Sequence, residues 1–180
     1  KIYNARWSIE RTCRDHAMRV DMETLKAASA KLKALLPQMQ AETDSGSLRG
    51  LEGAGAAIYF DVFDQLILNH KDVFSFTGRS RRPPLDPCNA LLSFAYSLLA
   101  NDCAAALEVV GLDSYVGFLH TDRPGRQSLA ADLMEELRPC FADRFVLSAV
   151  NLGRFSAKDF EAQENGAVYL SENARKTFLQ

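Results

Sequence analysis

Three side chains that can bind a metal ion stand far apart in this sequence: Glu52, His120 and Glu135. If folding brings them together, two carboxylates and an imidazole make a mixed oxygen and nitrogen ligand set. Such a set favours Mg²⁺ or Mn²⁺, although Zn²⁺ also accepts two acids and a histidine. A cation held there could polarise a phosphoryl oxygen and activate an attacking hydroxyl group.

Asp132 is a further candidate, on the same expected helix as Glu135. Residues three apart on a helix share a face, and two carboxylates there repel each other unless a cation or solvent screens them. Much of that helix is apolar, so we expect one of the two acids to point inward and to need a partner. A divalent cation would serve, whereas a solvated acidic face is the simpler interpretation.

The other candidates also have simpler interpretations. Glu52 lies among three glycines, at positions 50, 53 and 55, and each glycine costs a helix about 1 kcal/mol relative to alanine. Close packing of helices explains such glycines more often than close approach of a ligand. A histidine that follows an apolar stretch, as His120 does, is more often structural than a ligand. The alternative to an enzyme is therefore a non-catalytic helical interaction module.

A stiff basic loop lies between Glu52 and His120. Its three arginines, which precede a pair of prolines, are Arg79, Arg81 and Arg82. Guanidinium groups bind phosphate oxygens in a bidentate manner, and prolines limit the conformations of the loop. We predict that these arginines contact phosphate groups, and that two more, which follow His120, add to them. This second pair is Arg123 and Arg126. A solvated run of charges is the usual alternative.

The composition is that of an ordinary soluble globular domain. The 180 residues suffice for one domain with its own core, and the net charge of −2 argues against general coating of nucleic acid but not against a local basic patch. The four cysteines are scattered singly, which favours reduced thiols. We find no secretory signal and no apolar run of the roughly 20 residues that span a bilayer, and we expect a cytoplasmic protein outside the membrane.

Hydrophobic periodicity predicts a mainly α-helical single domain. Helices are expected over about residues 4–16, 21–37, 47–68, 87–111, 128–138 and 140–152. Pro37 should bend or end the second of these. The helix after Asp86 is apolar nearly all round, which predicts a buried central helix, and residues 69–85 read as a long loop. Asn165-Gly166 is a two-residue turn signal, which predicts a small β-hairpin near the C-terminus.

Capping residues indicate where the site-bearing helices begin. We expect Ser45 or Ser47 to cap the helix that carries Glu52, and Ser128 to cap the helix that carries Glu135. The chain begins without methionine and ends in an expected helix, so we expect it to be a piece of a longer protein.

Four segments resemble the CRISPR-associated Cas-one family (Cas1), the integrase of spacer acquisition. They are residues 48–53 (LRGLEG), 78–96 (GRSRRPPLDPCNALLSFAY), 117–120 (GFLH) and 128–139 (SLAADLMEELRP). Because the segments occur in order and cover most of the chain, the resemblance is specific. It implies that residues 1–180 are the family's C-terminal helical catalytic domain, without its N-terminal β-rich domain and C-terminal tail.

The resemblance also implies roles and partners. Glu52, His120 and Glu135 fall on the family's ligands for Mg²⁺ or Mn²⁺. Many members have aspartate in place of Glu135, which makes Asp132 the second choice for the third ligand. The implied activity is nuclease action on double-stranded DNA and a transesterification, in which the 3′-hydroxyl of a captured fragment attacks the CRISPR repeat. Implied partners are a second copy of the full-length protein and the small ferredoxin-like Cas-two protein (Cas2). A zinc-dependent hydrolase stays as the alternative enzyme.

Overall fold

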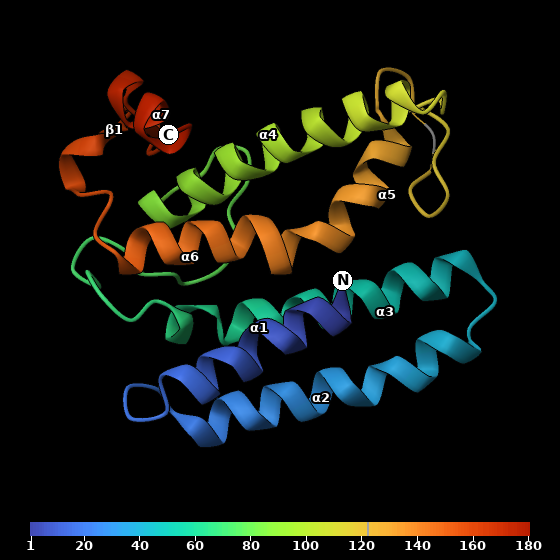
Figure 1. Cartoon of the computed structure of the whole chain (residues 1–180), viewed down its shortest axis with the longest axis horizontal. Coiled ribbons are helices and arrows are strands. Elements are labelled where there is room, and N and C mark those ends of the chain that lie inside the picture. The colour runs from blue at the N-terminus through green and yellow to red at the C-terminus, as the bar shows by residue number, and fades with distance from the viewer. Residues whose placement is uncertain (122) are drawn as a thin grey trace.

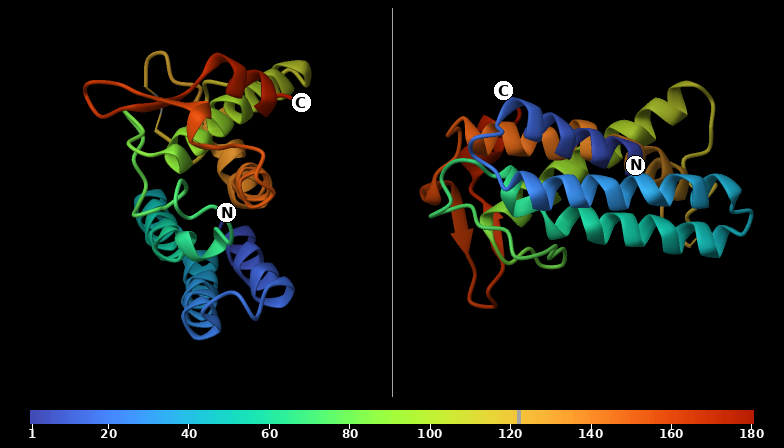
Figure 2. Two further views of the ribbon diagram at one scale, coloured as in Figure 1. Left: turned by 90° about the vertical axis from the view of Figure 1, so that its left-hand side faces the viewer. Right: turned by 90° about the horizontal axis from the view of Figure 1, so that it is seen from below.

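The protein, described here by a computed structural model, consists of helices in two layers (Figure 1). The structure describes residues 1–121 and 123–180. The first layer contains α1 (Ile2–Asp15), α2 (Met22–Ala41), α3 (Ser45–Asp61) and the short 3₁₀ helix η1 (Phe63–Leu66). The second contains α4 (Pro87–Val109), α5 (Ser128–Leu137), the π-helical turn η2 (Arg138–Ala142) and α6 (Asp143–Asn151). The left view of Figure 2 shows the same separation of the layers. The prediction of a mainly helical fold is confirmed.

The chain ends in a small β-hairpin and a last helix. Its elements are η3 (Ala157–Asp159), β1 (Phe160–Ala162), β2 (Val168–Leu170) and α7 (Glu172–Phe178). The strands are antiparallel, with Phe160 opposite Leu170, which confirms the predicted hairpin. The prediction of a two-residue turn at Asn165-Gly166 was wrong, because these residues lie inside the longer connection 163–167. Gly166 has a φ of +79°, the left-handed conformation that glycine adopts without strain.

α4 is the buried helix that the apolar pattern predicted. The Asp86 carboxylate accepts a hydrogen bond from the backbone N–H of Asn89, and Pro87 is the first helical residue. Leu91 and Leu92 are fully buried. By length and mean hydropathy α4 could cross a membrane, although polar and charged residues interrupt its apolar run. Half of the most apolar 18-residue stretch of α4 is buried inside the protein.

Several helix boundaries differ from the sequence-based expectations. The N-cap of α3 is Asp44, whose carboxylate accepts from the Ser47 backbone N–H. α3 ends at Asp61, and η1 follows it where the sequence predicted a continued helix. α2 runs through Pro37 to Ala41, so this proline does not end it. Propensity predicts a break at a proline, but tertiary contacts of the helix can outweigh that local cost.

Candidate metal centre

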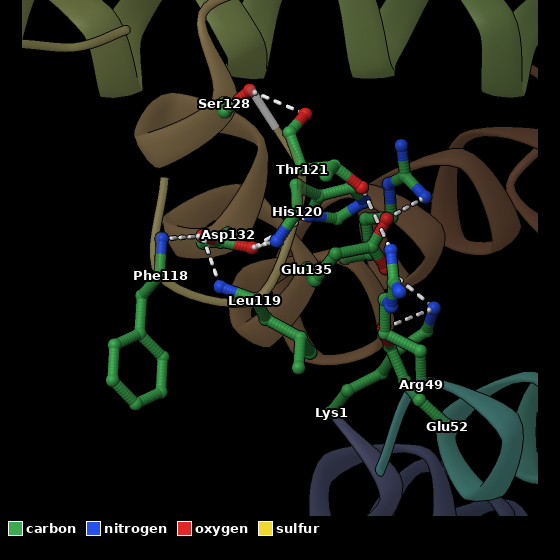
Figure 3. A network of polar contacts seen from close by, with 11 residues as sticks. Lys1, Arg49, Glu52, Phe118, Leu119, His120, Thr121, Ser128, Asp132 and Glu135 are labelled. Atoms are coloured by element: carbon green, nitrogen blue, oxygen red, sulfur yellow. Dashed lines mark hydrogen bonds and ion pairs between the residues drawn. The ribbon is translucent and has the colours of Figure 1, made fainter. Parts of the chain in front are cut away.

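Two of the predicted metal ligands meet at the junction of the layers, around the ammonium group of Lys1. Lys1 Nζ lies 2.9 Å from Glu52 Oε1 and 2.5 Å from Glu135 Oε2. The Lys1 side chain is 19% exposed, and the two glutamate side chains are each 13% exposed. Figure 3 shows the three side chains converging from the residue before α1, from α3 and from α5. The structure therefore brings Glu52 and Glu135 to one shared positive charge.

Packing on both sides of Lys1 fixes this arrangement. Ile2 packs so tightly on α3 that a Cβ atom at Gly55 would lie 2.6 Å from its Cδ1 atom. On the other side, Asn4 Nδ2 donates to the backbone carbonyl of Glu136 at 2.8 Å. Gly55 is thus a packing glycine, whereas a Cβ atom at Gly50 or Gly53 would meet nothing within 4 Å. The start of α1 is wedged between the two helices that carry the carboxylates.

A second cation orients Glu135. Arg138 pairs with Glu135 Oε1, so each carboxylate oxygen faces its own positive charge. Burial raises the pKa of Glu135, but Arg138 and Lys1 outweigh burial and lower the pKa overall. The Arg138 guanidinium also stacks over the ring of Tyr96, 4.5 Å from its centroid. Glu135 is therefore held in place and kept ionised.

Asp132 holds the loop that carries His120. Asp132 Oδ2 accepts backbone N–H groups of Phe118 and Leu119 at 2.6 and 2.8 Å. Its Oδ1 atom accepts the His120 backbone N–H at 3.0 Å and lies 2.6 Å from His120 Nδ1. Partial burial raises the pKa of Asp132, but these hydrogen bonds lower it overall. Both oxygens of the Asp132 carboxylate are thus engaged by residues 118–120, which suits an orienting role better than that of a metal ligand.

His120 lies close to Glu135, and its Nδ1 atom is 2.6 Å from Asp132 Oδ1 (Figure 3). An imidazole whose Nδ1–H bonds a carboxylate presents Nε2 as the ligand atom. Among the residues that the structure describes, no three acidic, histidine or cysteine side chains are yet close enough to hold a metal. The chemistry of Glu52, Glu135 and His120 suits a divalent cation, since the two carboxylates already share the positive charge of Lys1. Coordination by His120 requires a local approach of its ring.

The predicted phosphate-binding arginines differ in their surroundings. Arg79 turns inward: it donates to Asn89 Oδ1 at 2.5 Å, and its guanidinium lies 5.1 Å from the Tyr96 ring centroid. Arg81 and Arg82 are exposed and line a groove of about 590 Å³ between their loop, α4 and the hairpin. In the loop after His120, Arg123 is exposed and Arg126 is partly exposed. Phosphate binding by all five arginines stays a prediction.

A buried acid lies behind the site and makes stability depend on pH. Burial raises the pKa of Asp143 to about 7, against the lowering effects of the Tyr96 hydroxyl, which donates to it at 2.5 Å, and of Arg138. Between about pH 4 and pH 7 the folded protein therefore binds more protons than the unfolded chain, and stability falls as pH rises. Between pH 5 and pH 8, the free energy of unfolding in urea should fall by on the order of 2 kcal/mol more for wild type than for Asp143→Asn. Equal losses in both proteins would contradict this assignment.

Sequence reasoning missed three residues at the site. Arg138 could have been found, because a residue three positions after Glu135 on a helix shares its face. Arg49, whose NH1 group donates to Thr121 Oγ1 at 2.8 Å, joins α3 to the His120 loop. Lys1 gave no signal, since its partners are 51 and 134 positions away in sequence.

Comparisons with known proteins agree on one family. The sequence model of "CRISPR associated protein Cas1" matches residues 1–180. A "CRISPR-associated endonuclease Cas1 1" of Chlorobaculum tepidum is 50% identical over 179 residues, which are 99% of this chain and 52% of that protein. A "CRISPR-associated endonuclease Cas1" of Leptospira interrogans is 42% identical over 180 residues, which are 100% of this chain and 70% of that protein. The chain spans about half the length of most of the curated relatives it matches.

Solved structures share the fold. A chain of a "Partial Cas6-RT-Cas1--Cas2 complex" superposes with a TM-score of 0.82 at 31% identity, covering 99% of this chain and 53% of that one. A "Casposase bound to integration product" gives 0.75 at 27% identity, covering 99% and 51%. Family model, relatives and folds agree with the resemblance found in the four sequence segments, and the chain belongs to the Cas1 family.

Proposed function

We propose that this chain is the catalytic part of a divalent-metal-dependent DNA endonuclease and integrase that inserts captured DNA into a CRISPR array. The observation that carries the proposal is the meeting of Glu52 and Glu135 around one positive charge, with His120 close to Glu135. Glu52, His120 and Glu135 are the proposed ligands of Mg²⁺ or Mn²⁺. Relatives named as Cas1 endonucleases and a casposase described with its integration product support this class of reaction.

Each residue has a distinct task in this proposal. A bound divalent cation would supply polarisation of the scissile phosphodiester and activation of the attacking hydroxyl. Arg138 keeps the Glu135 carboxylate ionised and oriented. Asp132 Oδ1 accepts a hydrogen bond from the Nδ1–H group of His120, which leaves the Nε2 lone pair directed away from Asp132. The protein must also hold both DNA strands in reacting geometry. This positioning lowers the activation barrier because the reactants are already ordered.

The groove beside the arginine loop is the proposed path for DNA. Arg81, Arg82 and Arg175 line it together with Tyr169, which is 46% exposed. Guanidinium groups bind phosphate, and an exposed aromatic ring can stack on a base. Arg123 and Arg126 are proposed to add contacts nearer to His120. Arg79, although predicted to bind DNA, is better placed to support the loop from inside through Asn89.

The proposed setting is a larger assembly in the cytoplasm. The chain spans about half the length of the matched relatives, and we propose that it is the C-terminal domain of a longer protein that dimerises. Two structural neighbours are chains of complexes described as containing Cas2. We therefore propose a small Cas2 protein as a partner of the full-length protein.

A cleavage assay tests the proposed function against its alternatives. The full-length protein should cleave double-stranded DNA with Mn²⁺ or Mg²⁺ alone, and its DNA affinity should fall steeply with salt. A zinc hydrolase of small substrates would need Zn²⁺ and would lack the salt-dependent affinity. An interaction module would bind no metal and would show no cleavage under any of these conditions.

The arginine loop gives a quantitative prediction. The double substitution Arg81→Ala and Arg82→Ala should reduce the slope of log affinity against log salt by about 2, since each lost phosphate contact removes about 0.9. The measurement is fluorescence anisotropy of labelled duplex DNA from low to moderate salt. As a matched control, Lys31→Ala with Lys33→Ala removes two exposed charges from α2 and should leave the slope unchanged. Equal slopes for both double variants would exclude the loop from the DNA interface.

A further inference from the structure

The ammonium group of Lys1 stands where the proposed metal ion would have to lie. It is within ion-pair distance of one oxygen from each of Glu52 and Glu135, at 2.9 and 2.5 Å. Carboxylate oxygens bind divalent cations at about 2.0–2.6 Å, so one pair of oxygens has no space for both cations between them. Occupation of this gap by the metal and by the ammonium group is mutually exclusive.

Charge balance leads to the same exclusion. The two carboxylates carry two negative charges, and Lys1 and Arg138 carry two positive charges, so the cluster is neutral without a metal. A neutral, mostly buried cluster offers little attraction to a dication. Departure of the Lys1 ammonium restores a net negative charge at the gap. Arg138 would stay, because its guanidinium also stacks on Tyr96.

The Lys1 side chain borders a groove beside the carboxylates. Its backbone is fixed by Ile2, which packs against α3, but its long side chain has several rotatable bonds. Besides the carboxylates, Lys1 borders a groove of about 410 Å³ formed with Tyr3, Gln40 and Leu48. This groove is the proposed place for the ammonium group once it has left the carboxylates.

We propose that Lys1 is a resident counterion of the metal centre: its ammonium group holds Glu52 and Glu135 together in the metal-free protein and is displaced when a divalent cation binds. The inference rests on the proposed function, because it assumes that these carboxylates are metal ligands. Lys1 offsets the repulsion between two partly buried carboxylates before the metal binds. It also weakens the apparent metal affinity, since only molecules with the ammonium group withdrawn can bind.

The test is Mn²⁺ titration of the full-length protein by calorimetry and by electron paramagnetic resonance. Lys1→Gln removes the charge, Lys1→Arg retains it, and Lys33→Gln is a control for charge loss on an exposed face of α2. We expect Lys1→Gln to bind Mn²⁺ about 10-fold more tightly than wild type. This is the change for a wild type in which the ammonium group occupies the site in about nine molecules out of ten, so that only one in ten can bind the metal. Lys1→Arg and Lys33→Gln should remain close to wild type.

Thermal unfolding gives a readout that does not depend on activity. Without metal, Lys1→Gln should melt at a lower temperature than wild type because its carboxylates repel each other. Saturating Mn²⁺ should raise its melting temperature by more than it raises that of wild type, since a ligand stabilises the state it binds. Equal or weaker Mn²⁺ binding by Lys1→Gln overturns the inference. If wild type binds Mn²⁺ and Glu52→Gln does not, the proposed function is retained even though the inference about Lys1 is overturned. If wild type and Glu52→Gln bind Mn²⁺ equally, or neither binds it, the proposed function and the inference both fail.

Discussion

Replacing Glu52 by glutamine should abolish metal-dependent DNA cleavage, with a loss in kcat/KM of more than about 100-fold. Losses of 10- to 100-fold are typical when a residue that merely orients a ligand is changed, and a ligand itself should cost more. Glutamine keeps the size of the side chain but removes the charge that a hard cation requires. The measurement is cleavage of double-stranded DNA at saturating Mn²⁺, together with calorimetric titration of the metal.

Folding must be separated from chemistry in that experiment. Glu52→Gln also leaves Lys1 with one carboxylate partner instead of two, so a modest loss of stability is expected. Glu108→Gln, at an exposed position near the end of α4, is the matched control and should cleave like wild type. A folded Glu52→Gln protein that binds Mn²⁺ and cleaves DNA normally would show that Glu52 is structural, as in the interaction-module alternative.

Replacing Asp132 by asparagine should weaken Mn²⁺ binding about 10- to 100-fold, as expected for a residue that positions His120. The amide offers one oxygen where the carboxylate uses two, so the contacts to His120 and to the backbone of Phe118 and Leu119 cannot all be kept. Calorimetric titration with Mn²⁺ measures the change.

The same titration of Glu135→Gln resolves which acid is the third ligand. We expect this variant to lose more affinity than Asp132→Asn, since Glu135 faces Glu52 across the gap and Asp132 does not. If Asp132→Asn lost as much affinity as Glu135→Gln, or more, then Asp132 would be a ligand. That result would contradict the orienting role.

Local patterns predicted most of the helical fold. The apolar periodicity and the Asp86-Pro87 start were sufficient for α4, because the cap and the buried faces depend on neighbouring residues. The cap of α3 was missed although Asp44 adjoins the predicted serines, since several adjacent residues can cap equally well. The passage of α2 through Pro37 depends on tertiary contacts, which no local pattern contains.

The acids and the histidine of the candidate site could be predicted from sequence, but its positively charged side chains were not. The acids and histidine stand out because their types suit metal binding and because they occur in segments that resemble one family. Lys1 meets its partners only through packing of Ile2 against Gly55 and of α1 against the end of α5. Asp132 is a candidate ligand from sequence because it lies one turn from Glu135, whereas its hydrogen bonds to the loop depend on how residues 117–120 fold back.

The most direct test is a crystal structure of the protein soaked in Mn²⁺, with anomalous diffraction to locate the metal. We predict one strong anomalous peak bounded by Glu52, Glu135 and His120 Nε2, with the Lys1 ammonium group turned away from the carboxylates. A structure at saturating Mn²⁺ in which Lys1 still bridges the two glutamates, and in which the metal binds elsewhere or not at all, would contradict the account.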